Sequence, residues 1–151
     1  MNTIEKKEVF DIWLANIDER ISDWKNLVLK DAQYLVFDYT QESLKEMEKF
    51  LLTNYTFNSL EDENFYKDLD ACVSYIGETM RKILPGSKWH IYLEDDSNVD
   101  FGLPCILTLY SGPLTVHHLL IDIFREKNGN VLVERINKVL AYESLIREQL
   151  K

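Results

Sequence analysis

Residues 65–94 read FYKDLDACVSYIGETMRKILPGSKWHIYLE, and this stretch decides the fold. Up to Ile83 its apolar side chains recur every three or four residues, which is the spacing of one buried face of an α-helix. Pro85-Gly86 ends that helix, because proline cannot continue it and glycine favours a turn. From Trp89 to Glu94 apolar and polar residues alternate, as in a half-buried strand. The stretch therefore predicts a helix followed by the first strand of a sheet.

Strand character continues downstream of this stretch. Residues 104–111 (PCILTLYS) predict a second strand, and the polar link 95–102 joins the two into a hairpin with a long loop. Residues 114–125 fit either a third strand or a buried helix, and we favour the helix because strict alternation is lacking. After a turn at 127–130, apolar spacing predicts a final amphipathic helix over 132–146.

Helical spacing dominates upstream. Apolar residues predict a helix from about Thr3 to Lys30, and Ser22-Asp23 can divide it into a pair, since both residues cap more readily than they propagate. Residues 34–39 (YLVFDY) are aromatic and β-branched, which predicts a short strand. Thr40 then caps a helix over 43–54.

This order of elements, without repeats or linkers, indicates one domain over residues 1–151. Because helices and strands are segregated along the chain, we expect the α+β class. The expected architecture is a long N-terminal helix or helix pair, with a small, mainly antiparallel sheet of about three strands packed with helices.

The chain carries 26 acidic and 17 basic side chains, a formal net charge of −9. This sign disfavours nucleic-acid binding, which needs lysine and arginine to neutralise phosphates. The charge is uneven, because residues 1–70 contain 16 acidic and 8 basic side chains whereas residues 71–151 contain 10 and 9. We therefore expect a negative field on the N-terminal half, where it would attract a basic protein partner.

The sequence predicts neither export nor a membrane. Its first residues are polar and charged, unlike a signal peptide, and no apolar run approaches the roughly 20 residues that cross a bilayer. Cys72 and Cys105 lie in apolar surroundings without CxxC spacing, which favours reduced core residues over a disulfide or a reactive thiol. We expect a cytoplasmic protein.

Residues 96–102 (DSNVDFG) resemble a calcium loop only in part. Phe101 stands where the sharp-turn glycine belongs, and Leu107 stands in place of the bidentate glutamate, so we predict a solvated loop. Its acidic residues form the predicted partner-binding surface: Glu94, Asp95, Asp96 and Asp100. Of the tryptophans, Trp89 beside them is the better candidate for a partner contact, although we favour its burial in the core.

No motif for a nucleophile, a phosphate loop or a metal is present. His117 and His118 are adjacent, so on a helix they point about 100° apart and cannot share an ion. We predict no metal and no cofactor. A small hydrolase or ligand-binding enzyme assembled only by the fold stays an alternative, with four candidate pocket residues: Asp38, Glu78, His90 and His118.

Gly77 lies inside the predicted central helix, where glycine costs about 0.5–1 kcal/mol relative to alanine. We expect close packing against another element there, in preference to backbone access for a ligand.

Two parts of the sequence, 37–44 (FDYTQESL) and 75–78 (YIGE) with 101–104 (FGLP), together resemble small bacterial domains of unknown function. The resemblance extends over about residues 34–110 and implies no catalytic residue. In its compact, acidic character the chain is also similar to immunity proteins of contact-dependent or polymorphic toxin systems. Our hypothesis is a non-enzymatic protein that binds and neutralises a basic protein. The long amphipathic helices at both ends also allow a homo-oligomeric scaffold.

Overall fold

The computed structural model describes residues 1–28 and 30–151. Within these ranges the chain is α+β, as predicted, with helices around a three-stranded antiparallel sheet. The α-helices are α1 (Thr3–Ala15), α2 (Ile17–Val28), α3 (Gln41–Asn54), α4 (Tyr66–Ile83), α5 (Val116–Glu126) and α6 (Val131–Gln149). Short 3-10 helices, η1 (Phe57–Glu61) and η2 (Glu63–Phe65), precede α4. The strands are β1 (Lys88–Ile91), β2 (Pro104–Leu107) and β3 (Pro113–Thr115).

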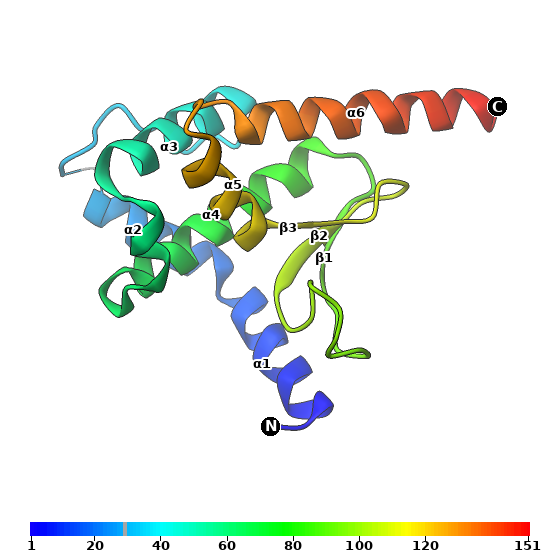
Figure 1. Ribbon diagram of the computed structural model, residues 1–151, viewed down its shortest axis with the longest axis horizontal. Helices are drawn as coiled ribbons and strands as arrows, with labels where there is room; N and C mark the ends of the chain where they lie inside the picture. Colours follow the sequence, from blue (N-terminus) through cyan, green and yellow to red (C-terminus); the bar gives the residue numbers. More distant parts are fainter. Residues whose placement is uncertain (29) are drawn as a thin grey trace.

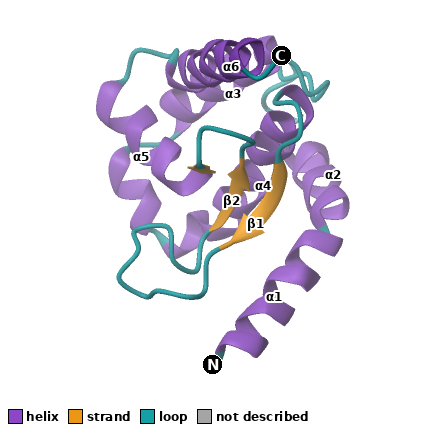
Figure 2. Ribbon diagram, turned by 90° about the vertical axis from the view of Figure 1, so that its right-hand side faces the viewer, coloured by secondary structure: helices purple, strands orange, loops and turns teal. Residues whose placement is uncertain are grey.

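Helix α4, which the opening stretch predicts, lies at the centre of the fold (Figure 1). Its residues 71–80 are buried without exception. A helix that is buried all round must be covered on several sides. Helices α2, α3 and α5 and the sheet supply that cover, and Figure 2 shows β1 and β2 passing across α4.

The sheet order is β1-β2-β3, with both pairs antiparallel. In the predicted hairpin, Lys88 pairs with Leu107 and Ile91 with Pro104. The segment 114–125 combines both structures that its sequence allowed. Its first two residues belong to β3, and the rest forms α5 in direct continuation.

The N-terminal helix is a pair, but the break lies at Asn16 and not at Ser22-Asp23. Asn16 ends α1, and its side-chain amide donates to the carbonyl of Ile12 at 2.9 Å. Ser22 and Asp23 are exposed in the middle of α2. An asparagine amide that bonds the backbone locally competes with helix propagation, and here the break comes nearly two turns before the predicted one.

Residues 34–39 form no strand, so that prediction is wrong. The Phe37 ring makes edge contacts with Trp24 and Tyr75, at centroid distances of 5.9 and 4.9 Å. Tyr39 adopts a left-handed φ of 59°, and its backbone N–H donates to the Tyr75 hydroxyl at 3.1 Å. Strand propensity reflects side-chain packing more than backbone preference. In this segment Phe37 packs on α2 and α4, and Tyr39 packs on α4, instead of on a sheet.

Two buried carboxylates connect α6 to distant segments. The oxygens of Glu48 on α3 accept the backbone N–H groups of Val131 and Leu132, each at 3.0 Å, and so cap the start of α6. Negative charge at this position is favourable to the helix dipole, while burial raises the pKa of Glu48. Glu143, which is 1% exposed, accepts the N–H of Tyr110 at 2.6 Å and anchors the β2–β3 turn to α6.

The end helices extend beyond the body, α1 with the N-terminus and the second half of α6 with the C-terminus (Figure 1). Both carry exposed apolar side chains, including Ile4 and Ile12 on α1 and Leu145 on α6. Within residues 1–28 and 30–151, no helix has the length and apolar character needed to cross a membrane.

Candidate functional site

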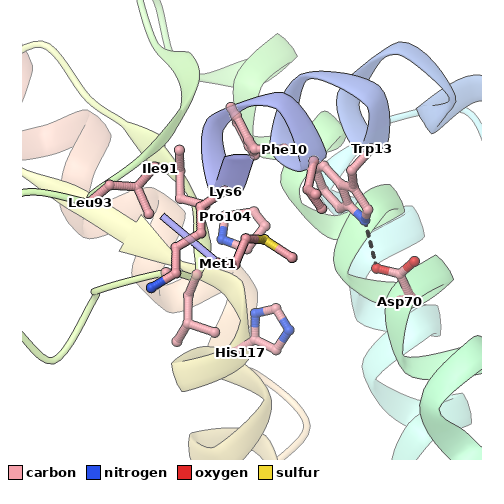
Figure 3. A pocket seen from close by; sticks show the side chains of 12 residues that line it. Met1, Lys6, Phe10, Trp13, Asp70, Ile91, Leu93, Pro104 and His117 are labelled. Carbon is pink, nitrogen blue, oxygen red and sulfur yellow. Dashed lines mark hydrogen bonds between the residues drawn. The ribbon is translucent and has the colours of Figure 1, made fainter. Parts of the chain in front are cut away.

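A groove of about 410 Å³ lies between α1, the β1–β2 hairpin and the start of α5 (Figure 3). Its volume falls within the range of roughly 300–1,000 Å³ that is typical of ligand pockets. Most of its lining is apolar: Met1, Val9, Phe10 and Trp13 from the N-terminal segment and α1, and Ile91, Leu93, Leu103 and Pro104 from the hairpin. The titratable side chains that line it are Lys6, Asp70 and His117.

Asp70 of α4 closes one end of the groove. Its Oδ1 accepts the indole N–H of Trp13 at 2.7 Å, and its Oδ2 lies 3.4 Å from Nε of Arg20. The Arg20 guanidinium also stacks over the Trp13 ring, 4.4 Å from the centroid, and donates to Ser74 Oγ at 2.8 Å. These contacts hold α1 against α4 and compensate the charge of Asp70 within the fold.

His117 lines the groove from the first turn of α5, facing α1 (Figure 3). Its Nδ1 is buried and has no hydrogen-bond partner among the residues that the structure describes. Burial lowers the pKa of His117, and the nearby charge of Asp70 only partly opposes that shift. The imidazole is therefore neutral at physiological pH.

Lys6 lies at the end of the groove away from Trp13 and Asp70 (Figure 3). Its Nζ is 4.7 Å from the centroid of the Phe101 ring, so the side chain reaches from α1 to the hairpin loop. None of the ion pairs between described residues uses Lys6. The neighbouring Lys7 is not part of the lining; it pairs with Asp11 at 2.5 Å, and its Nζ lies 5.1 Å from the centroid of the Phe10 ring.

The predicted pocket residues make separate contacts and do not converge. Asp38 is exposed and accepts the Thr40 hydroxyl at 2.7 Å, which stabilises the start of α3. Glu78 is buried, pairs with Arg81 and accepts the indole N–H of Trp89 at 3.3 Å. Both carboxylates are thus committed to local structure.

The two predicted histidines also lie apart. His90 on β1 makes an edge contact with the ring of Tyr92, at a centroid distance of 4.6 Å. His118 on α5 has its Nδ1 3.4 Å from Asp100 Oδ1. The groove is lined by His117 instead, so the adjacent histidine was the relevant one. Choosing between them required knowing where α5 begins.

The predicted acidic loop divides into an outer and an inner part. Glu94, Asp95 and Asp96 are exposed, and Asp95 accepts the N–H and hydroxyl of Ser97. These hydrogen bonds lower the pKa of Asp95. Asp100 instead turns inward and accepts the Thr115 hydroxyl at 2.6 Å. Three of the four loop carboxylates therefore face solvent.

Trp89 is 9% exposed and belongs to the core. The structure therefore shows it buried in the core and not on the predicted partner-binding surface. Its ring packs on Gly77, where an added Cβ would lie 2.1 Å from the nearest ring atom. The prediction that Gly77 serves close packing is confirmed. On its other side the ring meets Trp13 edge-on, at a centroid distance of 5.1 Å.

The N-terminal helices carry a second set of exposed acidic side chains, which we name the acidic helix-pair face. Its six carboxylate side chains are all exposed: Glu5, Glu8, Asp11, Asp18, Glu19 and Asp23. In the described part of the chain, Asp11 is the member of this set that forms an ion pair. Ile4 and Ile12 lie among these carboxylates with exposed fractions of 71% and 63%.

Sequence reasoning missed the groove, although one signal was present. Lys6 precedes Phe10 by four residues and so lies on the apolar stripe of α1, where a lysine is unexpected. Asp70 and His117 gave no comparable signal, because only the tertiary fold brings α4 and α5 to the inner face of α1.

Among the described residues, no three His, Cys, Asp or Glu side chains come together in a group that could hold a metal ion. Comparison of the chain with protein-family models, with curated proteins and with solved structures gave no significant match. The groove and the acidic helix-pair face are the candidate functional features of the fold.

Proposed function

We propose that this protein is a non-enzymatic interaction domain that binds a basic protein through its acidic helix-pair face. The supporting observation is a set of exposed carboxylates that are mostly free of internal ion pairs. Such a field accelerates the encounter with a positively charged partner, and apolar side chains among the charges then supply contact area. Ile4 and Ile12 are placed for that second role.

The most concrete form of the proposal is immunity to a toxin in a bacterial cell. The chain would bind the toxin and cover its active surface, for which it needs no catalytic group of its own. It would act in the cytoplasm, where the two free cysteines, Cys72 and Cys105, stay reduced. The exposed loop carboxylates Glu94, Asp95 and Asp96 would extend the negative field beyond the helix pair.

The experiment is a pull-down from the native host at low salt, followed by binding measurements with the product of any neighbouring gene. Reversing two charges of the face, Glu8→Lys with Asp23→Lys, should slow association about tenfold or more at low salt and less at high salt. Glu126→Lys, an exposed change on α5, is the matched control and should leave the rate nearly unchanged. Recovery of no protein partner, or equal slowing by the control, contradicts the proposal.

The homo-oligomeric alternative is tested separately. Sedimentation of the isolated chain at high concentration should give a monomer if α1 and α6 expose their apolar side chains for a different protein. A concentration-dependent dimer that Leu145→Glu disrupts would instead assign the projecting end of α6 to self-association.

A further inference from the structure

We propose that the groove between α1 and the β1–β2 hairpin binds a small amphipathic carboxylate, whose alkyl or aryl part contacts the apolar walls while its carboxylate contacts Lys6. This ligand site is distinct from the acidic helix-pair face, because none of the six carboxylates of that face lines the groove. Ligand binding in the groove therefore does not depend on the protein partner.

The walls determine the apolar part of the ligand. Phe10 and Trp13 on α1 face Ile91 and Pro104 on the hairpin across the groove (Figure 3). Transfer of alkyl or aryl surface from water to such walls is favourable in proportion to the area covered. The volume of about 410 Å³ accommodates a ligand of modest size and excludes a folded domain.

The charges determine the polar part. Asp70 already accepts the Trp13 indole N–H and lies beside Arg20, so it offers little to a cation. His117 is neutral, and its Nδ1 is buried. Lys6 is the remaining charged side chain among the described residues of the lining, and it forms no ion pair with a described residue. An anion is therefore the complementary charge.

Lys6 is also held in place for this contact. Its ammonium lies over the ring of Phe101, so a ligand would meet a side chain whose position is already restricted. The negative charge of the whole chain opposes any anion, but solvent-exposed carboxylates are screened beyond about 8–10 Å at ordinary salt. A direct contact with Lys6 is screened much less.

The test titrates the full chain with decanoate, below the concentration at which it forms micelles, by calorimetry and by the NMR signal of the Trp13 indole N–H. Decanol is the neutral comparison of the same chain length. Lys6→Met keeps the stem of the side chain and removes the charge. Lys7→Met is the matched control, because Lys7 is the adjacent lysine and pairs with Asp11. Leu103→Trp fills the groove, with folding checked by circular dichroism.

We expect decanoate to bind the wild-type chain and to shift the Trp13 signal, and Lys6→Met to weaken binding about fivefold. Lys7→Met should bind like the wild type, Leu103→Trp should abolish binding, and decanol should bind the wild type and Lys6→Met equally. The proposal is overturned if decanoate gives no heat and no shift. It is also overturned if decanol binds as tightly as decanoate to the wild type, which would describe an apolar site for a neutral ligand or for a side chain of a protein.

Discussion

Gly77→Ala should destabilise the protein although alanine is the better helix former. In the folded chain the new Cβ would lie 2.1 Å from Cη2 and 2.6 Å from Cζ2 of Trp89, whereas ordinary contacts begin at 3.4 Å. The ring would have to move by roughly 1 Å or more. It is 9% exposed, meets Trp13 edge-on and donates to Glu78, so its movement disturbs two further contacts.

The magnitude follows from two opposing effects. Overpacking of a filled core typically costs about 1–3 kcal/mol, and replacing a helical glycine by alanine returns about 0.5–1 kcal/mol. Because the clash is with a fixed ring and not with the end of a flexible side chain, we expect the overpacking cost to prevail. The free energy of unfolding should fall by about 1–2 kcal/mol.

Urea denaturation followed by circular dichroism measures this change, provided that the slope of the free energy with urea stays constant. Trp89→Phe supplies the decisive background, because it removes the ring atoms that the Cβ would meet. In that background Gly77→Ala should be neutral or stabilising by up to about 1 kcal/mol. Equal losses of stability in both backgrounds, or no loss in the wild type, would refute the argument from ring contact.

Three further predictions concern buried polar groups. Glu48→Ala leaves two backbone N–H groups at the start of α6 without an acceptor, so the free energy of unfolding in urea should fall by about 2–4 kcal/mol. Glu42→Ala, a change at an exposed residue of the same helix α3, is the control and should lower this free energy by less than about 1 kcal/mol. Burial lowers the pKa of His117 below 6.5, so the unfolded state binds its proton first on acidification. Stability should fall as the pH drops below about 6.5, and His117→Gln should remove that part of the fall; an NMR titration that gives His117 a pKa above 6.5 contradicts this. Burial raises the pKa of the Cys72 and Cys105 thiols, that of Cys105 to about 12. Both cysteines should therefore react with a thiol reagent in urea but not in native buffer. Rapid labelling of the native protein would contradict this prediction.

Prediction from the sequence succeeded where the decisive interactions are local. The apolar stripe of α4 and its stop at Pro85-Gly86 lie within one segment, and so does the Thr40 hydroxyl that caps α3 by accepting the N–H of Ser43 at 3.1 Å. The period change after residue 86 likewise placed the hairpin correctly. Each of these patterns lies within one short segment of the chain, so a single sequence was sufficient to predict the element.

Prediction failed where a distant segment replaced the expected partner. Residues 34–39 have the composition of a strand, but Tyr75 offers its ring and hydroxyl to Phe37 and Tyr39. In the same way Glu48 gave no sign in the sequence that it caps a helix beginning at Val131. Tertiary contacts determine both the conformation of residues 34–39 and the cap of α6, and the local sequence pattern predicts neither contact.

The candidate site follows the same division. The acidity of the first seventy residues was visible in the sequence, and six of its exposed carboxylates lie on α1 and α2. The groove was not visible, because its walls come from α1, the hairpin, α4 and α5. Trp89 was predicted as a candidate contact beside the acidic loop, yet the fold shows that Trp13 lines the groove and that Trp89 packs against Trp13 from the core.

Helix α1 thus has two chemically different sides, and the difference makes the two proposals separable. Lys6 faces the groove, whereas Glu8 lies on the exposed outer side. Lys6→Met should weaken decanoate binding without slowing association with a basic protein, and Glu8→Lys with Asp23→Lys should do the reverse. If decanoate instead changes the affinity for the protein partner, the two sites are coupled, and linkage then requires the partner to change the affinity for decanoate by the same factor. The coupling would pass through α1, because Trp13, Asp70 and Arg20 fix its position relative to α4.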